Sequence, residues 1–170
     1  QTIVNWSAFD PVIDTAAFPN MSSSDFWSST PQVRYSKAWC VSFYSINYLG
    51  TSNANCILRS NETNHAVRLV RGGESSGALL RITRPTSDYV DHGDGTVTHT
   101  PTRLTWKRCA VGQTWTGSAC SGEATTYTFE QANALTAGPT YAGQNDWRLP
   151  TEEELLSLVT SNRAKPAMNA

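Results

Sequence analysis

The sequence predicts an α+β domain in which short strands are followed by two helices and joined by disulfides. Three observations support this prediction. Short runs with β-type alternation fill the first part of the chain, two segments with helix-capping residues lie near its end, and four cysteines form two closely spaced pairs. The 170 residues, 39% of them hydrophobic, fit one domain with its own core.

The first predicted strand covers residues 38–44. Trp39, Val41 and Phe43 alternate there with smaller or polar residues, which is typical of a strand with one buried face. The stretch from about Ser45 to His65 is rich in Asn, Ser and Thr and is expected to form a surface loop or a loose hairpin.

The next predicted strand covers residues 66–71. Gly72 and Gly73 follow it and favour a turn over an extended interior, so we expect them to end the strand. A further strand is predicted at residues 79–82, after a segment rich in Gly and Ser.

A hairpin is predicted around the Asp91–Gly95 turn. The turn leads into a strand at 96–99, and a return strand follows at 104–106. Asp91 and Asp94 also suggest calcium, but the twelfth position of an EF-hand loop is not Glu, so a turn held by Asx hydrogen bonds is the favoured interpretation.

Two helices are predicted after this hairpin. Residues 128–135 carry apolar side chains near helical spacing. In the second helix, Thr151 and Glu154 have the spacing of a capping box, and Pro150 precedes the cap. Glu152, Glu153 and Glu154 are interpreted as solvated residues of the first turn, where they suit the positive end of the helix dipole.

The cysteine spacing predicts two local disulfides, Cys40–Cys56 and Cys109–Cys120, the simplest of the three connectivities. Zinc is the competing interpretation, but neither pair has C-x-x-C spacing and the three histidines lack paired ligand spacing. Disulfides persist in oxidising compartments, so we expect an extracellular or cell-surface protein.

Charge and hydropathy exclude several classes of partner. The chain carries 13 basic and 14 acidic residues, so it has no cationic surface for a nucleic acid. No apolar run approaches the ~20 residues of a membrane span. The chain opens at Gln1 without a signal-like segment, and we therefore expect a mature secreted product.

Catalytic motifs are not recognisable in the sequence. It contains no G-x-S-x-G, H-E-x-x-H, Walker or G-x-G-x-x-G pattern, so we expect no enzyme, no cofactor and no metal site. Aromatic, amide and basic side chains in and near the polar loop, including two basic residues before the first predicted strand, are candidate contacts for a glycan or a cell-surface receptor. These candidate ligand-binding residues are Arg34, Lys37, Tyr44, Tyr48, Asn53 and Arg59.

Several motifs resemble the Lcl C-terminal domain, the module at the end of collagen-like bacterial adhesins. They are Phe26-Trp27-Ser28-Ser29-Thr30, Ala38-Trp39, residues 67–73, residues 94–98, residues 104–107 and Asp146-Trp147-Arg148-Leu149-Pro150-Thr151. The chain departs from the family pattern at His92 and Arg103. The resemblance implies a C-type-lectin-like fold and a role in surface adhesion, including binding of sulfated glycans. It supplies no metal-binding residue.

The two halves of this resemblance stand in reversed order. Residues 1–73 resemble the second half of the domain and residues 79–170 the first, with residues 74–78 as a linker. The halves can close within one molecule as a circular permutant, or pair head-to-tail between subunits and propagate as a filament. A tandem repeat cut from a longer array is a third interpretation.

These observations lead to one functional hypothesis and two alternatives. The leading hypothesis is a non-enzymatic extracellular structural or adhesive protein, a subunit or repeat of a head-to-tail surface filament. The alternatives are a monomeric adhesin module that binds a glycan or receptor, and a variable ligand-binding protein of a diversity-generating retroelement, with the polar loop as its variable region.

Overall fold

The structure of the protein is a computed structural model that describes residues 13–21, 25–32, 37–43, 64–73, 86–135 and 140–158. Its strands are β1 (Asp25–Gln32), β2 (Lys37–Ser42), β3 (His65–Ala66), β4 (Val70–Gly72), β5 (Tyr89–Asp91), β6 (Thr96–His99), β7 (Leu104–Lys107), β8 (Thr114–Trp115), β9 (Cys120–Ser121) and β10 (Thr126–Tyr127). Its helices are the 3₁₀ turn η3 (Thr86–Asp88), α1 (Phe129–Ala134) and α2 (Glu152–Leu156). Short strands with two short helices agree with the predicted α+β class.

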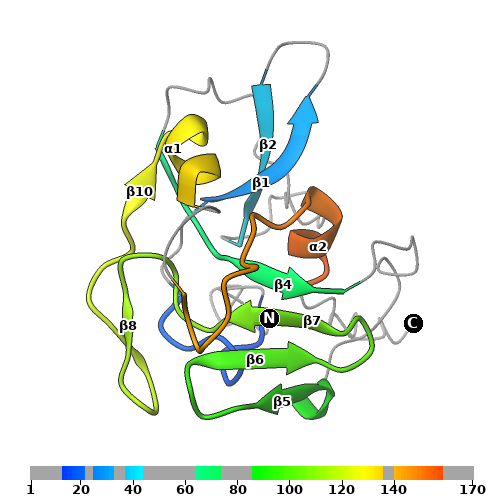
Figure 1. The fold of residues 1–170 in the computed structure, drawn as a ribbon, viewed down its shortest axis with the longest axis vertical. Helices are drawn as coiled ribbons and strands as arrows, with labels where there is room; N and C mark the ends of the chain where they lie inside the picture. The colour runs from blue at the N-terminus through cyan, green and yellow to red at the C-terminus, as the bar shows by residue number, and fades with distance from the viewer. Residues whose placement is uncertain are drawn as a thin grey trace, which may run out of the picture.

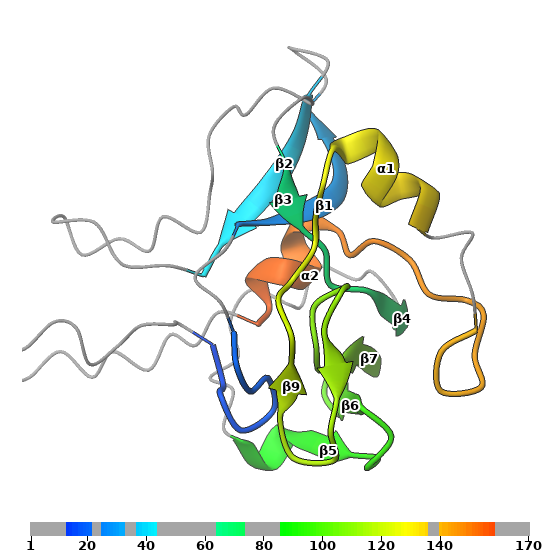
Figure 2. The same ribbon diagram turned by 90° about the vertical axis from the view of Figure 1, so that its left-hand side faces the viewer.

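The described strands form two four-stranded sheets and one small hairpin. The first sheet has the order β10-β3-β1-β2, the second has the order β4-β7-β6-β5, and β8 pairs with β9. Pairing is antiparallel except between β1 and β3, which are parallel. In Figure 1 the second sheet lies at the bottom, with β1, β2 and α2 above it. In Figure 1 α1 lies beside β10, and Figure 2 shows α1 at the end of the molecule away from β5.

Both sheets combine strands from distant parts of the sequence. We call the described residues between 13 and 73 the N-terminal segment and those between 86 and 158 the C-terminal segment. β3 of the N-terminal segment pairs with β10 of the C-terminal segment, and β4 pairs with β7. Neither sheet is complete without both segments.

Two apolar clusters form the core, and each draws on both segments. The first lies between the sheets and includes Phe18, Phe26, Val41, Phe43, Val97, Leu104, Trp106 and Leu155. The second includes Ala132 of α1 together with Trp27, Cys40, Val67, Trp147 and Leu149. The first sheet is therefore covered on both faces.

The strand predicted at 38–44 is confirmed as β2, but its burial differs from the prediction. Val41 and Phe43 are fully buried as expected, whereas Trp39 is only partly buried and Cys40 is completely buried. Because β2 has a core cluster on each face, alternation does not separate a buried face from a solvated one.

The single strand predicted at 66–71 is wrong. The chain leaves the first sheet at Ala66 and enters the second at Val70, so β3 and β4 belong to different sheets. Between them, Val67 and Leu69 accept backbone hydrogen bonds from Val111 (2.9 Å) and Lys107 (3.1 Å) of the C-terminal segment. β4 ends at the predicted Gly72, which has φ +68°.

The local predictions in the C-terminal segment are confirmed. The Asp91–Gly95 turn is held by Asx bonds, in which Gly93 N–H donates to Asp91 (2.8 Å) and Thr96 N–H to Asp94 (2.9 Å). Each helix begins with a complete capping box, Thr128 with Gln131 in α1 and Thr151 with Glu154 in α2. The strand predicted at 79–82 lies outside the described residues.

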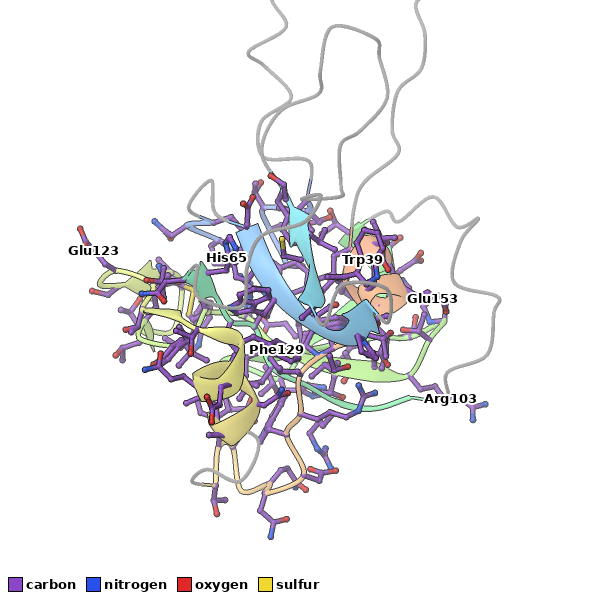
Figure 3. All side chains as sticks on the ribbon, turned by 90° about the horizontal axis from the view of Figure 1, so that it is seen from above. Trp39, His65, Arg103, Glu123, Phe129 and Glu153 are labelled. Carbon is purple, nitrogen blue, oxygen red and sulfur yellow. A yellow bond between two sulfur atoms is a disulfide. The ribbon has the colours of Figure 1, made fainter. Side chains whose placement is uncertain are left out.

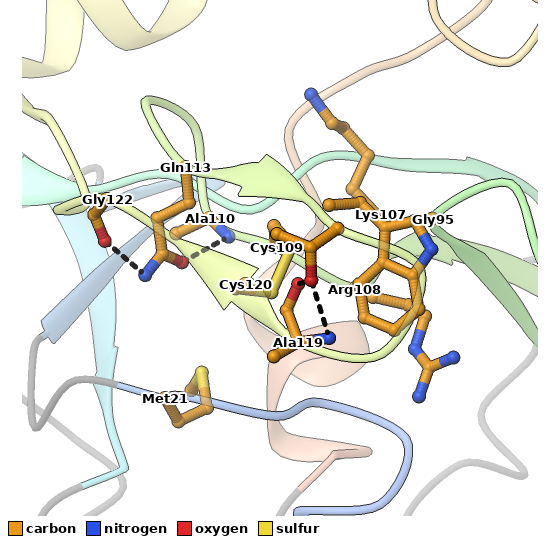
Figure 4. The surroundings of a disulfide bond; sticks show 12 residues. Met21, Gly95, Lys107, Arg108, Cys109, Ala110, Gln113, Ala119, Cys120 and Gly122 are labelled. Atoms are coloured by element: carbon orange, nitrogen blue, oxygen red, sulfur yellow. Dashed lines mark hydrogen bonds between the residues drawn. A yellow bond between two sulfur atoms is a disulfide. The ribbon is translucent and has the colours of Figure 1, made fainter.

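Cys109 and Cys120 form the predicted disulfide. It closes the loop that carries β8, and Gln113 ties the two arms of this loop together through Ala110 N–H (3.1 Å) and the Gly122 carbonyl (3.2 Å; Figure 4). Cys40 is also disulfide-bonded, and its predicted partner Cys56 lies outside the described residues.

Candidate functional site: the junction between the two segments

The junction is built around residues 146–151, the Asp-Trp-Arg-Leu-Pro-Thr motif. Its backbone pairs with β4, because Val70 N–H donates to the Arg148 carbonyl (3.0 Å) and Arg148 N–H donates to the Val70 carbonyl (2.9 Å). Near the end of the motif, Ser29 N–H of β1 donates to the Pro150 carbonyl at 2.7 Å. The motif thus forms backbone hydrogen bonds to one N-terminal strand in each sheet, β1 in the first and β4 in the second.

An ion pair between a half-exposed arginine and a buried carboxylate lies at the centre of the junction. Both guanidinium nitrogens of Arg148 donate to the Glu154 carboxylate, at 2.7 and 2.6 Å, and this hydrogen bonding raises the pKa of Arg148. The Glu154 side chain is 1% exposed and also accepts from Thr151 N–H at 2.8 Å. Arg148 further donates to the Gly72 carbonyl at the end of β4 (3.2 Å). Through these hydrogen bonds, Arg148 connects the cap of α2 to the N-terminal segment.

A second ion pair crosses the junction at the surface. Arg71 of β4 donates to Asp146 through Nε (2.7 Å) and Nη2 (3.2 Å), and Nη2 also donates to Gln144 (2.9 Å). Hydrogen bonding from Arg71 lowers the pKa of Asp146. Because both side chains are well solvated, the pair contributes little to stability and mainly fixes the alignment of the two segments.

Tryptophans supply the apolar part of the junction. Trp27 is completely buried, and its indole N–H donates to the Tyr127 carbonyl of β10 at 2.7 Å. Trp147 is 5% exposed, and its indole N–H donates to the Tyr141 carbonyl at 3.0 Å. Phe129 of α1, labelled in Figure 3, meets Trp27 edge-to-face with ring centroids 5.5 Å apart. Both indoles therefore bury their rings without leaving a polar atom unpaired.

Two buried arginines join the segments on the other side of the core. Arg68 is completely buried, donates to the Lys107 and Arg108 carbonyls, and lies over the Phe18 ring at 4.9 Å. Burial lowers the pKa of its guanidinium. Arg108 of the C-terminal segment donates to the Ala17 carbonyl at 3.0 Å and pairs with Asp91. Each segment thus places one cation against the backbone of the other.

Residues 95–170 match the family model of the Lcl C-terminal domain. This part of the chain is similar to that family. The matched range contains the Asp-Trp-Arg-Leu-Pro-Thr motif and both helices, so the family sequence supplies the C-terminal side of the junction. No curated protein and no solved structure matches the chain.

The Lcl C-terminal domain match indicates a surface-associated, adhesin-type domain. The resemblance of residues 1–73 to the other half of the Lcl C-terminal domain, and hence the reversed order, stays a prediction. Within the described part of the chain, no helix is long and apolar enough to cross a membrane.

The structure describes the side chain of none of the predicted ligand-binding residues. Arg34, Tyr44, Tyr48, Asn53 and Arg59 lie outside the described residues. Lys37 begins β2 opposite Gln32, and its side chain is likewise not described. The glycan or receptor site of the adhesin hypothesis therefore stays a prediction.

Sequence analysis missed the ionic residues of the junction. The prediction that Glu152–Glu154 are all solvated is wrong for Glu154, which turns inward to reach Arg148. The capping box located Glu154 correctly, but a cap motif carries no information about what packs over it. Arg68 carried no usable signal, because an Arg in a short apolar run is expected to face solvent.

Proposed function

We propose that this protein is a non-enzymatic, extracellular structural and adhesive protein with a C-type-lectin-like fold, and that it forms a subunit or repeat of a head-to-tail surface filament. The observation that supports the proposal most strongly is that the two segments are incomplete without each other. Both sheets and both clusters combine the two segments, the Arg71–Asp146 ion pair joins them, and Arg148 donates across the junction to the Gly72 carbonyl.

Burial provides the driving force for assembly. If the segments separated, Trp27, Phe26, Trp106 and Trp147 would lose their cover, and each large apolar side chain contributes roughly 2–3 kcal/mol when fully buried. A subunit with these apolar side chains exposed therefore pairs with the complementary segment, either its own or that of another subunit.

The same contacts serve either within a chain or between chains. A segment that docks on the next subunit reuses every bond of the junction and creates a heterologous interface, which propagates unless it closes into a ring. The oxidised cysteine pairs and the surface-associated family support a role outside the cell.

Cross-linking between differently tagged chains tests the proposal. Arg71→Cys is made in one tagged chain and Asp146→Cys in another, because these side chains touch across the junction and their pairing adds little stability. The two variants are mixed under assembling conditions and treated with a short bifunctional thiol reagent. The proposal expects a covalent product that contains both tags.

A double variant and a matched control complete the experiment. Arg71→Cys/Asp146→Cys in one chain reports closure within a molecule, and Arg71→Cys mixed with Glu123→Cys reports random collisions, since Glu123 is exposed and lies in the loop after β9. Cross-links confined to single chains of the double variant, with none between the tagged chains beyond the Glu123 control, would contradict the filament.

A further inference from the structure

Three potential metal ligands from three adjacent strands converge on one face of the first sheet. Asp25 begins β1, Cys40 lies in β2 opposite Trp27, and His65 of β3 precedes Ala66, which pairs with Phe26. Because side chains alternate along a strand, Asp25 shares the face of Cys40. β3 pairs with the edge of β1 opposite to β2, and its parallel register places His65 next to Asp25. Figure 3 shows His65 beside β1.

The ligand atoms of this group are close to coordinating distance. One atom of each of Asp25, Cys40 and His65 lies within 4.8 Å of the others, and His65 Nδ1 is 3.8 Å from the Asp25 carboxylate. Tetrahedral zinc with ligand bonds of about 2.0–2.3 Å requires ligand atoms roughly 3.5 Å apart. A small contraction of the three side chains therefore brings them to the spacing of a zinc site.

The surroundings suit a structural metal ion. Cys40 is completely buried and His65 is 7% exposed, while Asp25 is more accessible and provides a route from solvent. The Trp27 ring lies edge-on against the His65 ring with centroids 4.5 Å apart, which restricts the orientation of the imidazole. Thiolate, imidazole and carboxylate together form a ligand set that zinc accepts.

Oxidation keeps this site closed. Cys40 is disulfide-bonded, so its sulfur is not a thiolate in the oxidised chain. We propose that reduction of the Cys40 disulfide opens a site for a thiolate-preferring divalent cation of the Zn²⁺ class, held by Asp25, Cys40 and His65.

A dithiol reductant supplies the two electrons and two hydrogens that reduction of the Cys40 disulfide requires. The reductant attacks the disulfide of Cys40, is oxidised to its own disulfide, and gives its two hydrogens to the two protein sulfurs. The cation then replaces the thiol proton of Cys40, which goes to solvent, and water completes the fourth coordination position. The disulfide and the metal thus compete for one sulfur.

Cobalt titration of a variant that lacks one cysteine tests the proposal. Cys56→Ser removes the predicted partner of Cys40 and leaves a thiol there without reductant, while Cys109–Cys120 stays oxidised. We expect this variant to bind one Co²⁺ with a thiolate-to-cobalt charge-transfer absorption that Zn²⁺ displaces. The oxidised parent chain should show no such band. Absence of the band in folded Cys56→Ser would overturn the proposal.

A matched pair of histidine variants assigns the ligand. In the Cys56→Ser background, His65→Ala should weaken Co²⁺ binding at least about tenfold, whereas His92→Ala, an exposed histidine of the β5–β6 turn, should leave it unchanged. Equal affinities in the two variants would exclude His65 and with it the site.

A second measurement applies if Cys56→Ser does not fold. Cys109→Ser/Cys120→Ser removes the other cysteine pair, and the remaining disulfide is reduced with a phosphine. Saturating Zn²⁺ should then raise the melting temperature of the reduced chain, because a ligand that binds only the folded state stabilises it. A melting temperature unaffected by Zn²⁺ would overturn the proposal.

Discussion

Replacing Glu154 by Gln tests whether the Arg148–Glu154 ion pair stabilises the junction. Gln keeps the shape and can still accept from Thr151 N–H, but its amide cannot accept both guanidinium bonds of Arg148. A hydrogen bond to a charged group contributes about 1.5–3 kcal/mol. Because Arg148 is 36% exposed and can be rehydrated, we expect a loss of about 1.5–2 kcal/mol.

Glu153→Gln provides the matched control. It removes the same charge from the same helical turn, so both variants lose the favourable interaction with the helix dipole, about 0.3–1 kcal/mol, but Glu153 is exposed. Equilibrium urea unfolding should place the midpoint of Glu154→Gln clearly below that of Glu153→Gln with an unchanged slope. In thermal melts the difference corresponds to roughly 3–8 °C. Equal midpoints would refute the assignment of a stabilising role to the Arg148–Glu154 pair.

Three further predictions concern the C-terminal segment. Cys109→Ser/Cys120→Ser should cost about 3 kcal/mol in urea unfolding, because the disulfide spans a sequence separation of 11 residues. Gly95→Ala should lower the melting temperature more than Gly93→Ala: both glycines have positive φ, but a Cβ at Gly95 would lie 2.3 Å from a tyrosine hydroxyl, whereas Gly93 has nothing within 4 Å. The pKa of Asp91 is lowered, first by the Gly93 N–H and also by a guanidinium, so its contribution is present above its unfolded pKa of about 3.9 and is lost as pH falls through the lower folded pKa. Asp91→Asn should therefore flatten the acid limb of a pH–stability curve, and an unchanged limb would contradict this.

Local sequence signals predicted the parts of the fold that short-range chemistry determines. A capping box needs only Thr151 and Glu154, because the two bonds close within one turn. The Asp91–Gly95 turn and the Cys109–Cys120 loop are equally local. These features were predicted correctly without any knowledge of the tertiary structure.

Non-local packing determined the parts that the sequence could not reveal. Residues 66–71 look like one strand because they form a short, mainly apolar run that ends at two glycines, yet the chain crosses from one sheet to the other between Ala66 and Val70. Arg68 lies in this crossing, where backbone carbonyls more than 35 residues away accept its hydrogen bonds. Likewise, only the long-range approach of β4 and Arg148 makes Glu154 a buried residue.

The same distinction applies to the candidate site. The Asp-Trp-Arg-Leu-Pro-Thr motif was recognised from its resemblance to the Lcl C-terminal domain, and the family match to residues 95–170 confirms that part of the resemblance. The motif's contacts with Arg71, Gly72 and Ser29 depend on strand pairing across the chain. Such pairing leaves no periodic signal in the sequence.

Mass measured by light scattering over a range of protein concentrations tests the filament most directly. One chain has a mass of 18.6 kDa. If the segments pair between subunits, the mean mass should rise far above this value as concentration increases, and electron microscopy of the same samples should show fibres. A constant mass of 18.6 kDa at every concentration, with no fibres, would contradict head-to-tail assembly.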